Sequence, residues 1–554
     1  MIEDLWYKNA VIYSLDLETF MDLNGDGIGD FEGLNRRLDY LHALGVDAVW
    51  LAPFQLTPNK DNGYDIRDYY GVDPRHGSSG QFVEFMHHAN KRGIKVIIDL
   101  VVNHTSDQHP WFQQARSDEN SPYRDWYLWS EKKPADWNKG MVFPGVQKAT
   151  WTYDKKAKAY YHHRFYEHQP DLNMDNPAVR AEIRRIMGYW LQLGVAGFRA
   201  DAVPFMLESR SGSNGSSGGK KAETRFEYLH EMRRFLQWRR GDAILLGEAN
   251  VEPKENIKYF GTAEDGVHMM FNFFVNQHVF HALATSDIRS LTEALEATRL
   301  ASPNMQWANF LRNHDELDLG RLDKKQLEQV FERFSPEENM RLYDRGIRRR
   351  LAPMLGNRQQ SELAYSLMFS LPGTPVIRYG DEIGMGDDLS LKERDAVRTP
   401  MQWSDAPQAG FTTAEKPVHP VLSEGPYAYR HVNVEAQRRD ADSLLNWMTT
   451  LIRLRQECTE IGWGQWQILE TGDPCVLAMH YHWQGSSLVI LHNFSEKAHE
   501  IVLDLKRGEE CRLVNLLADN ESDADEKGRH RITLKAYGYR WYRAGDLSHL
   551  LVEK

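Results

Sequence analysis

Cysteine is scarce in this sequence. Its 554 residues include only Cys458, Cys475 and Cys511, an odd number confined to the last hundred residues and without the paired spacing of a metal-binding motif. The sequence therefore predicts neither a disulfide framework nor a cysteine-based metal motif. We expect these cysteines to be buried or free thiols.

Long apolar stretches and long basic stretches are missing as well. No segment has the ~20 uncharged apolar residues of a membrane span, and the first residues, Met-Ile-Glu-Asp-Leu-Trp, lack the basic and apolar regions of a leader. The net charge of -12 at pH 7 disfavours nucleic acid and anionic membranes as partners. We therefore expect a cytoplasmic protein that binds a neutral small molecule such as a sugar.

Apolar, strand-like runs alternate with amphipathic helical stretches along most of the chain. Such alternation predicts an α/β protein, a (β/α)8 TIM barrel. The expected strands are Val11–Leu15, Ala48–Ala52, Lys95–Val102, Gly197–Val203, Ala243–Glu248, Met269–Val275, Gln306–Leu311 and Thr374–Gly380.

Two segments interrupt or follow this alternation. Residues 105–175 are rich in Trp, Tyr, His and Pro, as expected for a subdomain inserted after strand three, between barrel parts 1–104 and 176–460. From 461 to 554, short alternating apolar runs predict a C-terminal antiparallel β-sandwich domain. We also expect the charged residues 318–350 to be helical and to lie over the cleft, and the Ser/Gly tract 209–221 to be flexible.

One stretch, Gly197-Phe-Arg199-Ala-Asp201-Ala-Val203, carries an arginine and an aspartate two residues apart. In a strand these two side chains project to the same face, so the cation keeps the carboxylate ionised and fit to act as a nucleophile. Three further apolar runs end in acids or histidines: 99–104, 245–250 and 310–315. A retaining glycosidase needs one ionised and one protonatable carboxyl group roughly 5 Å apart, and these runs supply such pairs.

Oxygen-bearing side chains alternate with glycines near the N-terminus, in Asp22-Leu-Asn24-Gly-Asp26-Gly-Ile28-Gly-Asp30. This pattern is similar to the start of an EF-hand loop and suits Ca²⁺, with Ile28 included in the candidate set. The downstream glutamate of an EF-hand is missing, so an ion here would be structural. The alternative is a Gly/Asp-rich turn without a metal.

In order and residue type, these segments resemble the signature regions of the α-amylase superfamily of glycoside hydrolases. The resemblance implies that Asp201 is the nucleophile, Glu248 the general acid/base and Asp315 the carboxylate that stabilises the transition state. It also implies a set of substrate contacts and a second Ca²⁺ site at Asn103, Asp171 and Glu208. The implied substrate contacts are Tyr64, Asp65, His104, Phe165, Gln169, Arg199, Asn250, His314, Glu316 and Arg394.

Two features place the sequence near particular members of that superfamily. Gln169-Pro-Asp-Leu-Asn173 resembles the marker of the oligo-1,6-glucosidase group, whose members act on short oligosaccharides. The runs 345–355, 393–403 and 432–437 look like those of trehalose synthases. The resemblance implies maltose and trehalose as substrates, sucrose as a further candidate, Ca²⁺ without an organic cofactor, and a homo-oligomer as one assembly to test.

The sequence also departs from the trehalose synthase pattern. Those enzymes carry a second glutamate where this chain has Gly320, and a pocket-closing arginine where it has Lys139. Because isomerisation requires a pocket that excludes water, these changes keep an α-glucosidase as the alternative. Sucrose isomerase is less favoured, because its characteristic loop after strand seven is missing. A non-catalytic relative would need a membrane anchor and lost catalytic acids, and the sequence has neither feature.

Overall fold

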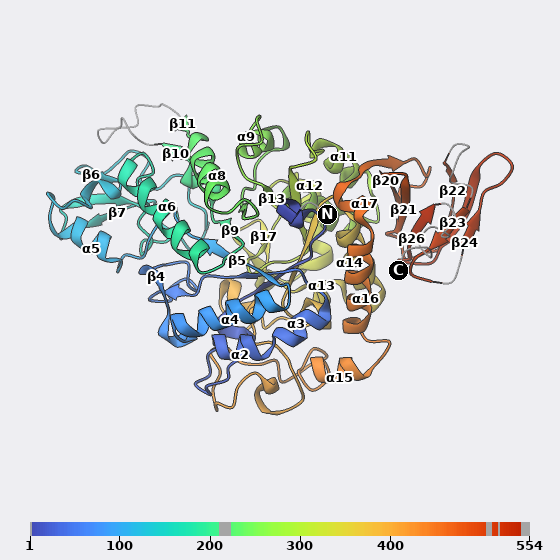
Figure 1. Ribbon diagram of the computed structural model, residues 1–554, viewed down its shortest axis with the longest axis horizontal. Helices are drawn as coiled ribbons and strands as arrows, with labels where there is room; N and C mark the ends of the chain where they lie inside the picture. The colour runs from blue at the N-terminus through green and yellow to red at the C-terminus, as the bar shows by residue number, and fades with distance from the viewer. Residues whose placement is uncertain (1–2, 210–222, 506–511, 519–520, 545–554) are drawn as a thin grey trace.

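Eight short apolar strands close into a parallel barrel at the centre of the molecule (Figure 1). The computed structural model describes residues 3–209, 223–505, 512–518 and 521–544. The barrel strands are β1 (Ile12–Leu15), β2 (Ala48–Leu51), β5 (Lys95–Leu100), β9 (Gly197–Ala200), β12 (Ile244–Gly247), β13 (Met269–Phe271), β14 (Gln306–Phe310) and β18 (Thr374–Arg378). Parallel pairing of β1 with both β2 and β18 closes the ring.

Burial on both faces explains why these strands read as continuous apolar runs rather than as alternating patterns. Trp50, Ile97, Leu246 and other side chains fill the barrel interior, separately from the larger core between strands and helices. Gly197 is required where β9 meets β12, because a Cβ there would lie 2.6 Å from the carbonyl oxygen of Ile244.

Helices surround the barrel, and capping residues in the sequence mark where some of them begin. The N-terminal end of α4 is a capping box, in which Ser78 Oγ accepts the Gln81 N–H while Gln81 Oε1 accepts the Ser78 N–H. The helices of this part are α1 (Leu17–Phe20), α2 (Phe31–Arg36), α3 (Leu38–Leu44), α4 (Ser79–Lys91), α6 (Pro177–Gln192), α7 (Val203–Met206), α8 (Glu227–Arg239), α9 (Asn256–Phe260), α10 (Phe273–Thr285), α11 (Arg289–Ala297), α13 (Leu351–Leu355), α14 (Arg358–Ser370), α15 (Val434–Arg439) and α16 (Leu444–Glu457).

The segment between β5 and α6 contains a small antiparallel sheet, which lies at the left of Figure 1. Its elements are α5 (Pro110–Ser117), β6 (Trp129–Ser130), β7 (Trp151–Asp154) and β8 (Ala159–His162). Two further strand pairs join loops near the barrel: β3 (Gln55–Leu56) with β4 (Asp68–Val72), and β10 (Glu208–Ser209) with β11 (Glu223–Thr224).

The segment after β14 differs from the helical expectation for residues 318–350. Only α12 (Lys324–Phe334) is an α-helix there, and the remainder includes a three-stranded sheet of β15 (Leu317–Asp318), β17 (Gly346–Ile347) and β16 (Arg341–Leu342). The turn between β16 and β17 holds Tyr343 and Asp344 at φ of 55° and 61°. Left-handed residues of this kind favour a tight hairpin over a continued helix.

The last part of the chain packs two antiparallel sheets against each other, at the right of Figure 1. After α17 (Thr459–Trp463), one sheet contains β19 (Gln465–Leu469), β20 (Val476–Trp483), β21 (Ser486–Asn493), β26 (Tyr539–Ala544), β23 (Arg512–Asn515) and β24 (Glu521–Asp523), and the other contains β22 (His499–Asp504) and β25 (Arg529–Leu534). Val489, Ile501, Leu534 and their neighbours form a separate core between the sheets. Trp541 Nε1 donates to Ser366 Oγ of α14 at 2.9 Å and ties this domain to the barrel.

The fold class expected from the sequence is confirmed: a closed eight-stranded barrel followed by an antiparallel domain. The strands are shorter than expected. β9 ends at Ala200 rather than Val203, because Ala202 adopts a left-handed φ of 51° and α7 begins directly after it. Most of the Ser/Gly tract 209–221 lies outside the described residues. No helix in the described ranges has the length and apolar character needed to cross a bilayer.

Candidate active site

The three expected catalytic acids follow three barrel strands at their carboxyl ends. Asp201 follows β9, Glu248 follows β12 and Asp315 follows β14, and all three line one cavity of about 440 Å³. The loops at this end of a TIM barrel are where its active sites are built. The carboxylates are therefore gathered by topology, although together they span more than a hundred residues of sequence.

Arg199 on β9 links the acids of this cavity. Its side chain is buried, and its Nη1 lies 2.5 Å from Asp99 Oδ1 and 2.6 Å from Asp201 Oδ1. Its Nη2 lies 2.8 Å from Glu248 Oε1. One guanidinium thus holds the expected nucleophile and the expected acid/base side by side, as the sequence predicts for Arg199 and Asp201.

The protonation of these two acids is set by burial against this cation. Burial raises the pKa of Asp201 to about 6, with Arg199 opposing the shift and Asp99 adding to it. Burial likewise raises the pKa of Glu248 to about 7, again opposed by Arg199. The Ala202 N–H also donates to Glu248 Oε2 at 3.0 Å and orients it. Near neutral pH, Asp201 is mostly ionised while Glu248 exchanges a proton readily, which matches a nucleophile and a general acid/base.

Asp315 is the most strongly ionised acid of the site. Burial favours its neutral form, but the charges of Arg394 and Arg398 outweigh burial and hold its pKa well below the usual range. Arg394 Nη1 lies 3.0 Å and Arg398 Nη2 3.1 Å from the same Oδ1 atom. Arg394 also contacts Glu316 at 2.7 Å. A permanently charged carboxylate at this place can stabilise a positively charged, oxocarbenium-like transition state.

Tyr64 and two histidines form one wall. Tyr64 Oη lies 2.7 Å from His314 Nε2, their rings are stacked at 5.5 Å, and His104 Nε2 lies 3.0 Å from the Tyr64 carbonyl oxygen. Burial lowers the pKa of His314 to about 3 and also lowers that of His104. Both imidazoles are therefore neutral at pH 7 and suit hydrogen bonding to sugar hydroxyls.

Aromatic rings from the inserted segment and from the β16–β17 turn gather beside the cavity. Phe143 of the inserted segment stacks on Tyr166 at 4.8 Å and contacts Tyr343 of the β16–β17 turn at 4.9 Å. The guanidinium of Arg394 lies 4.9 Å from the Phe143 ring. Phe165 also lines the cavity and contacts Phe143 at 5.8 Å. Apolar rings at this place limit the access of water.

A second connection joins the inserted segment to the segment after β14. Arg345 Nη2 donates to the Val142 carbonyl oxygen at 3.1 Å, and Arg345 Nε lies 3.4 Å from Asp318. We call Asp318, Arg345 and Val142 the latch. It lies beside Gly320, where a Cβ would be 2.9 Å from Arg345 Cδ. The arginine side chain thus takes up space next to the position of the missing glutamate.

Most of the expected substrate contacts line the cavity, but Asp65 does not. Asp65 is fully buried and accepts hydrogen bonds from Thr57 Oγ1 and from the N–H groups of Lys60 and Asp61. Asp61 lines the cavity instead, with Gln169 Nε2 donating to its Oδ2 at 2.8 Å. The expected contacts that line it are Tyr64, His104, Phe165, Asn250, His314, Glu316 and Arg394. Arg199 and Gln169 do not line the cavity themselves, but they contact Asp201 and Asp61, which do.

The sequence reading missed several residues of the site. Asp61 lies four residues before the aspartate that was chosen, and Arg398 four residues after Arg394 in the same run. These two could have been found by treating each motif as a whole. Phe143 and Asp318 were not singled out in any motif, and Arg345 begins the run 345–355 that resembles trehalose synthases; only the structure brings the three together.

The loop 22–30 presents an oxygen-only donor set, which suits a hard cation such as Ca²⁺. Asp22 and Asp30 are buried at 3% exposure, Asp26 is exposed, and no lysine or arginine in the described ranges pairs with any of the three. The side chains order the loop: Asp22 accepts the Gly25 and Gly27 N–H groups, and Asp26 accepts that of Ile28. Asp22 and Asp30 are thus buried without a lysine or arginine partner in the described ranges, although their oxygens accept hydrogen bonds, and the donor types of Asp22, Asn24, Asp26, Ile28 and Asp30 keep this loop a calcium candidate.

The second expected metal set does not fit an ion in this way. Asp171 is paired with His162 Nδ1 at 2.8 Å and accepts the Asn103 amide at 3.2 Å, and Glu208 is paired with Arg164. Arg164 already supplies a positive charge to Glu208, and the oxygens of Asp171 are engaged by Asn103, His162 and the Arg164 N–H. We therefore carry forward only the loop 22–30 as a calcium candidate.

Comparisons with known proteins agree with this geometry. Residues 14–336 and 337–464 match the model of the α-amylase catalytic domain, and residues 485–543 match a sucrose hydrolase-like C-terminal domain. A trehalose synthase of Thermus thermophilus is 43% identical over 97% of this chain, which spans 55% of that relative's length. One of Pimelobacter sp. (strain R48) is 40% identical over 98% of this chain and 96% of its own.

A crystal structure of a variant of trehalulose synthase MutB superposes with a TM-score of 0.78, at 26% identity, over 97% of this chain and all of the other. The family match covers the barrel, the catalytic acids and the loops that hold them. This chain therefore belongs to the α-amylase family of enzymes that act on α-glucosides.

Proposed function

We propose that this protein interconverts maltose and trehalose by retaining glucosyl transfer, with hydrolysis as a side reaction. The observation that carries the proposal is its 43% and 40% identity to two trehalose synthases over nearly the whole chain. The substrate set, maltose and trehalose with sucrose as a further candidate, follows from that relation.

The site supports each step of a double displacement. Asp201 attacks the anomeric carbon of the bound glucosyl unit while Glu248 protonates the glycosidic oxygen, so the bond to the second glucose breaks and a β-glucosyl ester forms. The released glucose turns to present its anomeric hydroxyl. Glu248 removes the proton of that hydroxyl as it attacks the ester, which forms the α,α-1,1 bond and frees Asp201. Asp315 stabilises the positive charge in both transition states.

The fate of the ester depends on whether glucose or water reaches it first. The stacked rings of Phe143, Tyr166 and Tyr343 and the latch connect the inserted segment to the segment after β14. These contacts retain glucose. Gly320 lacks the side chain that would narrow the cavity further, which favours some loss to water.

Hydrolysis of short α-glucosides is the second candidate, and it rests on Gly320. The same ester would form, and water would replace glucose as the acceptor, with no other change in the roles of the acids. Sucrose isomerisation has less support, because the trehalulose synthase variant is only 26% identical.

Product chromatography separates the candidates. With maltose alone, we expect trehalose together with a free-glucose fraction larger than a tightly closed isomerase releases. With added labelled glucose, we expect label in the disaccharides in proportion to how often the cavity opens and the released glucose exchanges with glucose in solution. Glucose as the sole product, with no label in any disaccharide, would shift the assignment to the hydrolase.

Three further points belong to this proposal. Ca²⁺ at the loop 22–30 is supported by its oxygen-only donor set and by the buried Asp22 and Asp30, which pair with no lysine or arginine in the described ranges. A cytoplasmic location is supported by the free Cys458 and Cys475. Self-association is consistent with the resemblance and is measured directly by light scattering.

A further inference from the structure

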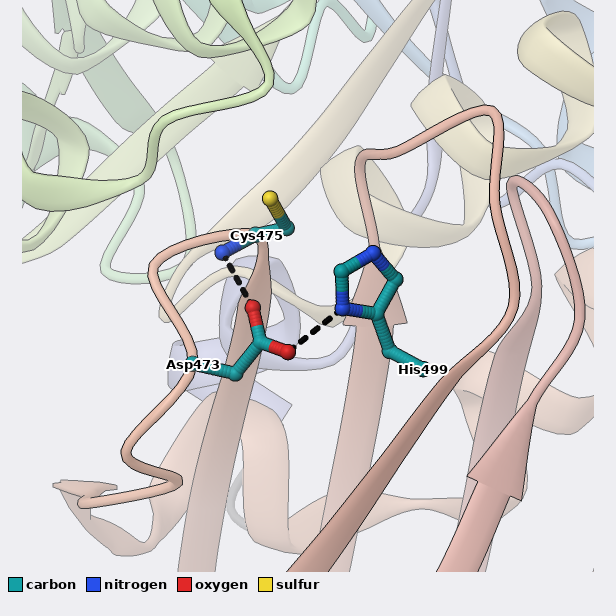
Figure 2. A group of neighbouring side chains, drawn as sticks. All are labelled: Asp473, Cys475 and His499. Atoms are coloured by element: carbon teal, nitrogen blue, oxygen red, sulfur yellow. Dashed lines mark hydrogen bonds and ion pairs between the residues drawn. The ribbon is translucent and has the colours of Figure 1, made fainter.

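Outside the catalytic cavity, the described ranges bring His, Cys and acidic side chains together in a single group of three or more with metal-like spacing. It consists of Asp473 and Cys475, in the turn between β19 and β20, and His499, the first residue of β22 (Figure 2). One possible ligand atom from each residue lies within 4.8 Å of those of the other two. All three side chains are partly buried.

Asp473 connects the other two residues of the group. Asp473 Oδ2 lies 2.5 Å from His499 Nδ1, and Asp473 Oδ1 accepts the Cys475 N–H at 2.8 Å. Figure 2 shows the thiol and the imidazole on the same side of the aspartate. No lysine or arginine in the described ranges pairs with Asp473, whose side chain contacts the His499 imidazole.

We propose that Asp473, Cys475 and His499 form a zinc-binding site. A thiolate, an imidazole and a carboxylate together make the borderline-soft donor set that Zn²⁺ prefers, whereas Ca²⁺ and Mg²⁺ take oxygen ligands. Zinc bonds of about 2.0–2.3 Å in a tetrahedron place ligand atoms about 3.3–3.5 Å apart. Asp473 and His499 lie closer than that, at 2.5 Å, and the Cys475 sulfur lies within 4.8 Å of both, so side-chain rotations of about 1 Å would bring the three ligand atoms to that spacing.

Binding would exchange one set of bonds for another without any redox change. The Cys475 thiol releases its proton to solvent as the sulfur–zinc bond forms. Any proton on His499 Nδ1 moves to Nε2 or to solvent, so that this nitrogen and the Asp473 carboxylate, no longer hydrogen-bonded to each other, each form a bond to the metal. Water takes the fourth position.

The position of the group means that a bound metal would connect separate parts of the C-terminal domain. Asp473 and Cys475 lead into the six-stranded sheet, whereas His499 starts the two-stranded sheet. The same turn is tied to the barrel, because the Ile288 N–H donates to the Pro474 carbonyl oxygen at 2.9 Å. A bound ion would therefore join the two layers of the C-terminal domain beside their contact with the barrel.

Sequence spacing did not reveal this group. A metal motif is recognised from pairs of ligands a few residues apart, and here the third ligand is 26 residues away on another sheet. Only the packing of the two sheets brings His499 to the turn.

The test uses the full chain, freed of metal with a chelator and returned to buffer containing Ca²⁺. ZnCl₂ is titrated by calorimetry, and CoCl₂ is added separately to observe the thiolate-to-cobalt absorption band. Asp473→Asn, Cys475→Ser and His499→Gln remove one ligand each. His482→Gln, which changes an exposed histidine of β20, is the matched control.

We expect one saturable zinc site, a rise in melting temperature with zinc, and a cobalt band that Cys475→Ser abolishes. Each ligand variant should weaken zinc binding by about tenfold or more, since the metal loses a direct bond, while His482→Gln binds like the parent. Wild-type protein without a saturable site or without the cobalt band overturns the proposal. So does zinc that binds equally to all three ligand variants, which would mean an adventitious surface site only. The saturable site and the cobalt band are both measured on the wild-type protein, so the test still decides if one of the variants fails to fold.

Discussion

Arg199 couples the protonation of three acids through one side chain. Asp99, Asp201 and Glu248 all contact its guanidinium, and burial raises the pKa of each of them. Three carboxylates around one cation cannot all be ionised at no cost, so one of them retains a proton near neutral pH. The position of Glu248, with a pKa of about 7, makes it the group that exchanges that proton during turnover.

The first prediction is a bell-shaped pH dependence of kcat/KM for maltose. Asp201 must be ionised to attack, so activity rises as pH increases through about 6, and Glu248 must be protonated to assist departure, so activity falls above about 7. Because the two acids share Arg199, the measured limbs belong to the pair. Initial rates at constant ionic strength measure them.

Two variants check the assignment of the limbs. Glu248→Gln should flatten the descending limb with an activated aryl glucoside, whose leaving group needs little protonation. Asp201→Asn should keep the fold and lose nearly all turnover, since an amide is not a competent nucleophile. Activity that stays constant from pH 5 to pH 9, or turnover in Asp201→Asn like that of the parent, would contradict the roles.

At this scale the sequence predicted the three acids that the structure gathers in one cavity and most of the residues that line it, because a motif at a strand end constrains where its side chains point. It did not distinguish Asp61 from Asp65. Both flank the same tyrosine, and the choice is made by the loop, in which Asn62 and Gly63 adopt left-handed φ of 46° and 91°. Such a turn reverses the chain, so that Asp61 faces the cavity while Asp65 folds back against the backbone of the loop.

Among the elements, the β15–β17–β16 sheet and the inserted segment determine how well the cavity is closed. They meet through Arg345, which reaches Asp318 in its own sheet and the Val142 carbonyl oxygen of the insert. The strained turn residue Tyr343 adds its ring to Phe143. The sequence did not predict this contact, because Val142 and Arg345 are about two hundred residues apart and the run 345–355, which begins with Arg345, does not indicate the segment that it meets.

The second prediction concerns this latch. Arg345→Ala should raise the ratio of free glucose to trehalose several-fold, since losing a charged hydrogen bond of about 1–2 kcal/mol frees the insert from the sheet and admits water. Asp318→Asn should act in the same direction but less strongly. Chromatography of the products from maltose gives the ratio.

The matched control is Arg299→Ala, which removes an arginine that likewise contacts one carboxylate, Glu296, and one carbonyl oxygen, that of Trp466, away from the cavity. Its product ratio should equal that of the parent. Gly320→Glu should lower the ratio, because its backbone allows a side chain and the flexible Arg345 can move aside. Equal ratios in Arg345→Ala and Arg299→Ala would rule out the latch.

Across the whole molecule, the loop 22–30 joins the first and last parts of the barrel. The Asp22 N–H donates to the Phe411 carbonyl oxygen at 3.0 Å, and the Val418 N–H donates to that of Gly27 at 2.8 Å. This loop follows β1, and residues 411–418 follow β18, the two strands whose pairing closes the ring. An ion that fixes the loop would therefore stabilise the closure of the barrel rather than a local turn.

The last prediction is that Ca²⁺ stabilises the folded protein without entering the chemistry. A ligand present at 100 times its dissociation constant stabilises by about 2.7 kcal/mol, so chelation should lower the melting temperature by several degrees and added Ca²⁺ should restore it. The experiment is carried out in the Cys475→Ser background, so that zinc lost to the chelator does not contribute. Asp26→Asn should lower the melting temperature and abolish the response to Ca²⁺, whereas Asp405→Asn, another exposed aspartate, should leave both unchanged. A melting temperature that chelation does not alter, with Asp26→Asn indistinguishable from the parent, would reduce the loop to a turn held only by its own hydrogen bonds.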